Sequence, residues 1–283
     1  AEVEARGPEL LWLNFQAVHP AIGVVEDAAY VGVWIPSKEK GRITQLLYLV
    51  TENRKLIRVD ADEFSRRGWY LQHKPLFFPP RWHLDDVKAW VDGISGKPNP
   101  AEVLEAVLRE WLTYIDFSDA RDYIFHALWT IGTYFFPLFN AYPYDYLGGV
   151  KRTGKTKVLM LLLMLAFNAI FSQDISSAAM FRLIQNTRCT LLIDETEKLR
   201  NPKRAEDFRL MLNAGYKKGA LAYRVEKRGK AGKLIPQGYE VYSPKALANI
   251  AGLEDVLEDR CITFIMKRTR NPAIANAEID ETD

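Results

Sequence analysis

The sequence predicts an α/β fold in which helices enclose a parallel sheet, and two observations carry that prediction. A glycine-rich segment lies between a short strand-like run, 142–147, and a long apolar helix former, 158–171. A second run, 188–195, is expected to be a buried strand that ends in two carboxylates. It follows the glycine-rich segment by about 40 residues, enough for one helix and a loop, and such alternation is typical of parallel sheets.

Composition indicates an ordinary globular protein. The 283 residues are 48% hydrophobic and 26% charged, with a formal net charge of +2. Contact with nucleic acid would therefore have to come from local basic patches. Cys189 and Cys261 lie in predicted buried strands without a C-x-x-C partner, and we interpret them as core residues. The four histidines lack ligand spacing, so no metal site made from side chains alone is indicated.

We expect no membrane-spanning segment. The run 158–171 is too short to cross a bilayer, and 124–139 is interrupted by Gly132 and Pro137. The chain begins Ala-Glu-Val-Glu and shows no charged-then-apolar signal segment. The expectation is therefore an excised piece of a longer, cytoplasmic protein.

Residues 1–97 are expected to form a small α+β domain. The runs 30–35, 43–51 and 55–59 are rich in β formers, and the turn-prone residues 52–54 predict a hairpin between the last two. Tryptophans interleaved with basic residues in this domain either stack on nucleic-acid bases or, as most such residues do, fill a small core. The role of the domain stays open.

The second predicted domain, 98–283, begins with a helical lead-in, 98–138. Asn99 is a good N-cap with Pro100 at the first helical position, and apolar residues then recur at helical spacing. A second helix is expected over 118–136. We interpret its aromatic residues as core: Tyr123, Phe125, Trp129, Tyr134 and Phe135.

The glycine-rich segment, 149–156, fits the phosphate-binding pattern G-x-x-x-x-G-K-[S/T]. Its glycines let the backbone wrap round an anion with the N–H groups inward, and the helix N-terminus that follows adds its positive dipole end. We therefore expect a nucleotide-binding core, 139–270, that holds ATP. The residues assigned to the nucleotide are Gly149, Lys151, Arg152, Thr153, Gly154, Lys155, Thr156 and Lys157.

The two carboxylates after the second strand are interpreted as a Walker B pair. Strands of a parallel sheet present their carboxyl ends to the ligand crevice, so Asp194 is expected to reach a Mg²⁺ ion that Thr156 also holds. Glu195 is expected to polarise the water that attacks the γ-phosphate. An Asp-Glu pair, compared with a lone Asp, favours hydrolysis of ATP over transfer of its γ-phosphoryl group to a second substrate.

A basic hairpin is predicted between the Walker B pair and the next central strand. The runs 221–226 and 234–242 are expected to be strands, and the tip between them carries four basic residues: Lys227, Arg228, Lys230 and Lys233. Such a tip either contacts the DNA backbone or is a solvated loop.

The strand 245–250 brings Asn249 beside Glu195, and here the chain resembles the AAA+ ATPases, in which a polar residue at this place orients the attacking water. The run 257–265 is similar to the family's arginine-bearing segment. The resemblance implies that Arg260 reaches a γ-phosphate, either that of a neighbouring subunit or that of its own, and we expect it at the sheet edge that faces the ligand.

More narrowly, residues 213–220 and 243–246 together with Asp259 and Arg260 resemble helicase-like ATPases of plasmids, viruses and integrated elements, relatives of the minichromosome maintenance and superfamily III helicases. The resemblance implies a homo-oligomeric ring, expected to be a hexamer, that acts on single-stranded or forked DNA. It assigns catalysis to Lys155, Glu195, Asn249 and Arg260. Two alternatives remain: an initiator or loader that does not unwind DNA, and a regulatory ATPase with a protein partner.

Overall fold

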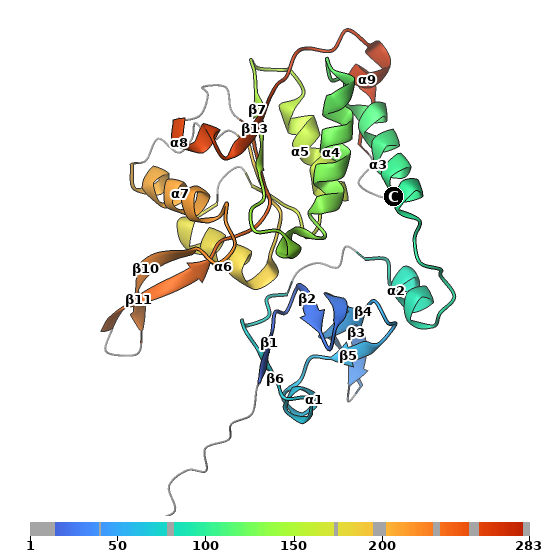
Figure 1. The fold of residues 1–283 in the computed structure, drawn as a ribbon, viewed down its shortest axis with the longest axis vertical. Helices are drawn as coiled ribbons and strands as arrows, with labels where there is room; N and C mark the ends of the chain where they lie inside the picture. Colours follow the sequence, from blue (N-terminus) through green and yellow to red (C-terminus); the bar gives the residue numbers. More distant parts are fainter. Residues whose placement is uncertain are drawn as a thin grey trace, which may run out of the picture. The chain divides into compact units, whose positions relative to one another are not determined.

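The computed structural model describes residues 15–39, 41–77, 82–172, 175–194, 202–228, 233–248 and 255–279. The chain divides into two compact units, Ala1–Ser95 and Gly96–Asp283 (Figure 1). The sequence-based boundary at residue 97 lies next to this division.

The first unit is built on an antiparallel sheet with the strand order β2-β3-β4-β5. Its strands are β2 (Ile22–Val25), β3 (Ala28–Glu39), β4 (Arg42–Thr51) and β5 (Leu56–Arg58). The remaining elements are a parallel pair, β1 (Gln16–Val18) and β6 (Trp69–Leu71), and two helices, α1 (Ala61–Arg66) and α2 (Leu84–Val91). The hairpin predicted across residues 52–54 joins β4 to β5. Apolar clusters cover both faces of the sheet, one around Leu49 and Trp69 and the other around Val33 and Val87.

The second unit contains a five-stranded, fully parallel sheet with the strand order β13-β7-β12-β9-β8. Its strands are β7 (Tyr144–Gly148), β8 (Ile170–Ser172), β9 (Leu191–Ile193), β12 (Lys245–Ala248) and β13 (Cys261–Ile265). An antiparallel hairpin, β10 (Leu221–Arg228) and β11 (Lys233–Glu240), stands outside this sheet. The α/β core with a parallel sheet that the sequence predicted is therefore present.

Helices cover both faces of the parallel sheet (Figure 1). The helices described in this unit are α3 (Pro100–Tyr114), α4 (Ala120–Gly132), η1 (Phe136–Leu138), α5 (Lys155–Leu165), α6 (Ser177–Thr187), α7 (Pro202–Ala214), α8 (Asp255–Glu258) and α9 (Pro272–Asn276). The chain crosses from β7 to β8 through α5 and returns towards β7 through α6 and α7. Parallel crossovers are right-handed, so reversing direction puts α5 and α6 on opposite faces. The core agrees: Val158 of α5 packs with Trp111 and Trp129, whereas Phe181 of α6 packs with Met211.

Several element boundaries differ from the predicted ones. The α3 prediction is confirmed, because Asn99 accepts a hydrogen bond from the N–H of Ala101 and Pro100 begins the helix. The helix predicted over 158–171 is too long: α5 ends at Leu165, and the last part of the run forms β8, whose Phe171 lies opposite Leu192. A continuous apolar run does not distinguish a buried helix from a buried strand.

No helix in the described ranges is long and apolar enough to cross a membrane.

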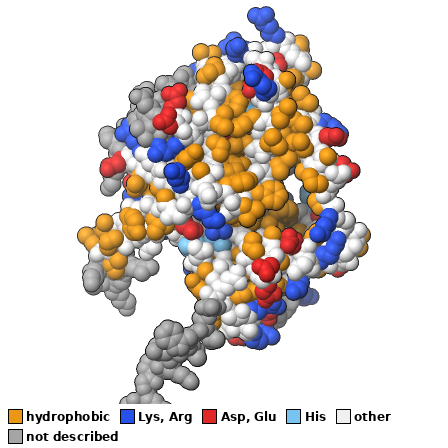
Figure 2. All heavy atoms as spheres, in the orientation of Figure 1, with side chains coloured by type: hydrophobic (Ala, Val, Ile, Leu, Met, Phe, Trp, Pro, Cys, Tyr) orange, Lys and Arg blue, Asp and Glu red, His pale blue; other side chains and the backbone are white. Residues whose placement is uncertain are grey.

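An apolar stripe lies exposed on α4 and the turn after it. The side chains recur at helical spacing and are about half exposed or more: Ile124 (50%), Leu128 (54%), Phe135 (51%), Leu138 (67%) and Phe139 (45%). Figure 2 shows apolar side chains gathered over this part of the unit. The interpretation of Phe135 as core is therefore wrong; Phe135 lies after the end of α4, whereas Trp129 within α4 is buried. The aromatic residues within α4, Tyr123, Phe125 and Trp129, all pack in the same apolar cluster.

Candidate nucleotide-binding site

The loop between β7 and α5 has the backbone that the glycine pattern requires. Gly149 (φ 133°), Arg152 (φ 62°) and Gly154 (φ 89°) all have positive φ. A Cβ atom at Gly149 would lie 2.6 Å from the carbonyl oxygen of Met266, so no larger residue fits there without a shift. Gly154 stands immediately before the first residue of α5, so the loop leads directly into a helix N-terminus.

Lys155 turns its ammonium group back across the loop. Its Nζ atom donates hydrogen bonds to the carbonyl oxygens of Gly149 (2.7 Å) and Val150 (2.9 Å), and the residue is only 8% exposed. Thr153 closes the same turn, because its hydroxyl donates to the carbonyl oxygen of Val150 at 2.9 Å. These contacts keep the Lys155 ammonium group against the loop, beside the N-terminus of α5, the end of a helix that attracts anions.

Thr156 and Asp194 come together at the carboxyl end of the sheet, as the sequence predicted. The Thr156 hydroxyl donates a 2.7 Å hydrogen bond to Oδ2 of Asp194, although the two residues belong to different elements. Asp194 is 6% exposed and follows directly after β9. A hydroxyl oxygen and a carboxylate oxygen at this separation fit the hard oxygen ligands that Mg²⁺ prefers.

Glu195 and Asn249 lie outside the described residues, but the strands that lead to them are clear. Glu195 directly follows Asp194, and Asn249 directly follows Ala248, the last residue of β12. β12 lies between β7 and β9. The described part of β12 thus ends at Ala248, between the strand that precedes the glycine loop and the strand that precedes Asp194.

Arg260 lies at the other end of the sheet. The N–H of Tyr144 donates to its carbonyl oxygen at 2.9 Å, so Arg260 sits beside the first residue of β7, whereas the loop follows the last. At about 3.3 Å per residue, the five residues of β7 separate Arg260 from the loop by roughly 16 Å. The expectation that it lies at the ligand-facing edge is wrong, because β13 is parallel to β7 and Arg260 comes before β13.

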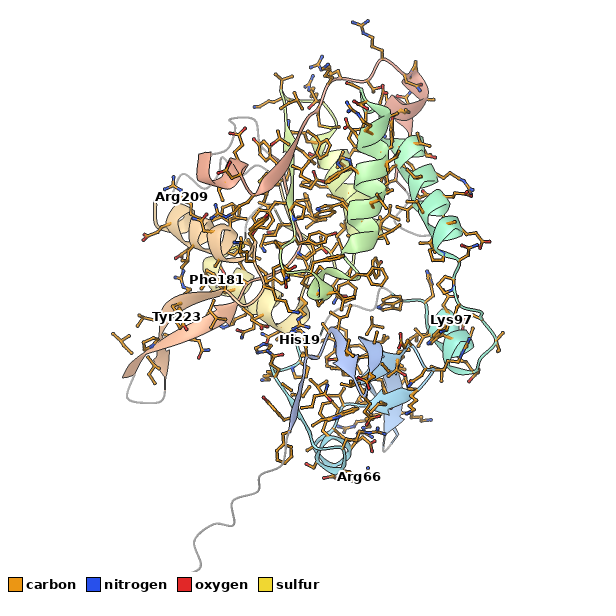
Figure 3. The ribbon with its side chains drawn as sticks, viewed as in Figure 1. His19, Arg66, Lys97, Phe181, Arg209 and Tyr223 are labelled. Atoms are coloured by element: carbon orange, nitrogen blue, oxygen red, sulfur yellow. The ribbon has the colours of Figure 1, made fainter. Side chains whose placement is uncertain are left out.

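The hairpin β10–β11 is attached to the unit through one of its faces. Arg224 pairs with Asp207 of α7, and Glu226 accepts a 2.6 Å hydrogen bond from Arg182 of α6. Tyr239 on the same face is buried and packs against Phe181 at a ring-centroid distance of 5.7 Å. Phe181 is labelled in Figure 3. These contacts come from two helices, so the hairpin is held against the unit.

The opposite face of the hairpin is apolar and exposed. It carries Leu221 (42%), Tyr223 (64%), Val225 (66%) and Leu234 (62%). Of the predicted basic tip, Lys227, Arg228 and Lys233 lie in the two strands, while Lys230 falls outside the described residues.

Two lysines have contacts that the sequence did not foretell. Lys157, assigned to the nucleotide, donates instead to the carbonyl oxygen of Ile274 at 2.7 Å, and burial lowers its pKa. Lys245 at the start of β12 is fully buried, and burial lowers its pKa to about 7. A lysine at the start of an apolar strand gives no sequence signal of burial, because its partners are backbone carbonyl groups brought there by the fold.

Comparison with known proteins gives no further identification. No protein-family model matches the chain, and no curated protein matches it.

Proposed function

We propose that the second unit binds and hydrolyses ATP, and that the protein is a ring-forming motor on DNA, a replicative helicase of a plasmid, virus or mobile element. One observation carries the ATPase part: the Lys155 ammonium lies within the glycine loop while Thr156 is hydrogen-bonded to Asp194. A phosphate-binding loop and an oxygen pair suited to Mg²⁺ thus adjoin the same helix N-terminus.

Each residue has a separate task in this proposal. Lys155 neutralises charge on the β- and γ-phosphates, and Thr156 and Asp194 hold Mg²⁺, which supplies charge neutralisation for the transferred group. Glu195 polarises the attacking water and Asn249 orients it. The position of β12 between β7 and β9 supports the role of Asn249, because Asn249 is the next residue after β12.

We propose that Arg260 acts on the nucleotide of a neighbouring subunit. Its distance of roughly 16 Å from its own loop exceeds what an arginine side chain can span, which favours action in trans over action in cis. A residue that completes its neighbour's site requires an oligomer, and closure of such head-to-tail contacts gives a ring. A hexamer is the size that the family resemblance implies.

The DNA part of the proposal rests on the hairpin. Basic residues at the tip of two anchored strands suit contact with phosphate groups without sequence preference. The exposed apolar face beside them favours one alternative, a regulatory ATPase that uses the hairpin to bind a protein partner. A loader that remodels DNA complexes without unwinding would use the same tip.

Two assays separate these candidates. ATP hydrolysis is measured with and without forked DNA, and strand displacement is measured on the same fork. A helicase shows stimulation and displacement, a loader shows stimulation alone, and a regulatory ATPase shows neither. Absence of ATP hydrolysis under all conditions, with ATP binding also absent, would reject the proposal as a whole.

A further inference from the structure

A basic segment follows β13, an edge strand of the parallel sheet. Three of the four residues from Lys267 to Arg270 are basic, and no acidic residue occurs between Asp259 and Glu278. The side chains of Lys267, Arg268 and Arg270 are exposed, and none of them forms an ion pair or a hydrogen bond with a residue in the described ranges. Figure 2 shows Lys and Arg side chains at the end of the unit where β13 leads into α9. We call these three residues the basic strip.

Hydrogen bonds hold the backbone of this segment in place. The N–H of Met266 donates to the carbonyl oxygen of Gly148 at 2.8 Å, which ties the start of the segment to the end of β7. Within the strip, the Thr269 hydroxyl donates to Asp116 at 2.5 Å and accepts from the N–H of Asn271 at 2.9 Å. The segment is therefore fixed on both sides of its basic residues. A backbone that is already fixed loses little conformational entropy when its side chains bind a ligand.

The three cations of the strip lie close together. Lys267 and Arg270 are three residues apart, so even a fully extended backbone separates their Cα atoms by no more than about 11 Å. This distance is comparable with the Debye length of about 8 Å, and the like charges repel one another. A ligand with several negative charges relieves that repulsion. Arginine and lysine are the side chains that proteins use to bind phosphate, so the strip suits a row of phosphate groups.

The strip is displaced from the phosphates of the proposed nucleotide. Thr156 and Asp194 fix the place of Mg²⁺ in that proposal, and Asp194 follows β9. β13 and β9 lie on opposite sides of β7, with β12 also between them. Because neighbouring strands are about 4.8 Å apart, the strand that leads to the strip is roughly 14 Å from the strand that leads to Asp194. A second, longer polyanion matches the strip better than the nucleotide does.

We propose that the basic strip binds the sugar–phosphate backbone of a nucleic-acid strand, as a contact separate from the hairpin tip. This inference rests on the DNA part of the proposed function. The hairpin packs against α6 and α7, whereas the strip is tied to Asp116 beyond α3, and these helices belong to the two different apolar layers of the unit. Contacts between cations and phosphate groups carry no base preference, so the strip adds affinity without sequence specificity.

The test measures binding of a labelled single-stranded oligonucleotide to the full chain by fluorescence anisotropy at several salt concentrations. The strip variant is Lys267→Ala/Arg268→Ala/Arg270→Ala. Loss of three phosphate contacts should make the log–log dependence of affinity on salt shallower by roughly two units, at about 0.7 for each contact with a single strand. Affinity at low salt should fall about tenfold or more. ATP affinity, measured by calorimetry, should stay unchanged.

Two further variants separate the charge of the strip from other effects. The matched control Lys38→Ala/Lys97→Ala/Arg109→Ala removes three exposed cations from separate parts of the chain, and we expect it to keep the wild-type slope. The variant that exchanges lysine for arginine and arginine for lysine at the three strip positions keeps every charge, and it should keep most of the affinity. Unlabelled oligonucleotide should displace the labelled strand more effectively than polyglutamate with the same number of charges.

Four results overturn the inference. An unchanged slope in the strip variant, with a shallower slope in the hairpin-tip variant, rejects the strip and leaves the DNA part of the proposed function standing. An equal loss in the matched control shows a general effect of net charge. Equal competition by polyglutamate assigns the strip to acidic proteins instead of nucleic acid. Weaker ATP binding with unchanged oligonucleotide binding assigns it to the nucleotide.

Failure of the proposed function gives a different result. If the wild type does not bind the oligonucleotide even at low salt, the DNA part of the proposed function fails together with the inference. Should the triple strip variant not fold, Arg268→Ala alone decides, because loss of one contact should still make the slope shallower by about 0.7.

Discussion

The backbone N–H of Tyr144 donates a 2.9 Å hydrogen bond to the carbonyl oxygen of Arg260. This bond aligns the start of β13 with the start of β7, and it places the arginine at the end of the sheet that faces away from its own phosphate loop. In the proposed function this side chain completes a neighbour's site and not its own, so that ATP hydrolysis requires a pair of subunits.

Arg260→Ala should nearly abolish hydrolysis while leaving ATP affinity of the isolated subunit almost unchanged. Removal of an arginine that acts in trans costs about 10³ to 10⁵ in rate. Mixing Arg260→Ala subunits with Lys155→Ala subunits should restore part of the activity, because some interfaces then pair an intact loop with an intact arginine. Arg109→Ala, an exposed position on α3, is the control. Mixed rings that stay inactive at every ratio would exclude action in trans.

Variants of the glycine loop and of the proposed Walker B pair should separate ATP binding from ATP hydrolysis. Lys155→Ala removes the ammonium that lies in the loop, and we expect ATP binding to be lost. Glu195→Gln keeps the size of the side chain but removes the base, and we expect ATP to bind while hydrolysis stops. Calorimetry and phosphate release measure the two effects. Hydrolysis by Glu195→Gln at close to the wild-type rate would contradict the Walker B assignment.

The hairpin tip should bind phosphate groups and not bases. Replacing its four basic residues, Lys227, Arg228, Lys230 and Lys233, with alanine should weaken DNA binding for every sequence tested. The log–log dependence of affinity on salt should become shallower by roughly one unit for each phosphate that is no longer neutralised. Fluorescence anisotropy at several salt concentrations measures the slope. Lys38→Ala/Arg42→Ala, at another hairpin of the chain, is the matched control, and an unchanged slope in the tip variant would leave the tip as a solvated loop.

Lys245 should make stability depend on pH near neutrality. Its Nζ atom donates to the carbonyl oxygens of Val241 and Ser243, both at 2.9 Å, and burial lowers its pKa from 10.5 to about 7. Between pH 7 and 10.5 the Lys245 side chain is protonated in the unfolded chain and neutral in the folded chain. The free energy of unfolding therefore rises with pH. The slope approaches about 1.4 kcal/mol per pH unit.

The measurement is made between about pH 6.5 and 7.8, below the unperturbed pKa values of cysteine and tyrosine. Above this range these groups ionise in the unfolded chain, whereas burial raises the pKa of Cys189 and Tyr144 in the folded chain. Chemical denaturation across this window should give a rising stability for the wild type and a flatter profile for Lys245→Met. Lys151→Met, an exposed position in the loop, should keep the wild-type slope. An identical slope in Lys245→Met would show that the lysine does not titrate here.

The features that the sequence predicted correctly are those that depend only on residues adjacent in the chain. Asn99 and Pro100 start a helix because capping needs only adjacent residues, and the glycine pattern marks the loop because it needs positive φ at fixed positions. The end of α5 and the burial of Lys245 depend on which strands lie beside them. The location of Arg260 depends on the direction of β13, and no periodicity in the sequence encodes that direction.

The strand order also has a consequence for how the chain folds. Both neighbours of β7 come late: its partners in β12 and β13 follow roughly a hundred residues after it, and pairings of such long range form slowly. During synthesis we therefore expect β7 to lack strand partners on both edges until β12 and β13 have left the ribosome. We expect chain fragments that end before residue 245 to aggregate even though they contain the complete loop, since such exposed strands are prone to associate.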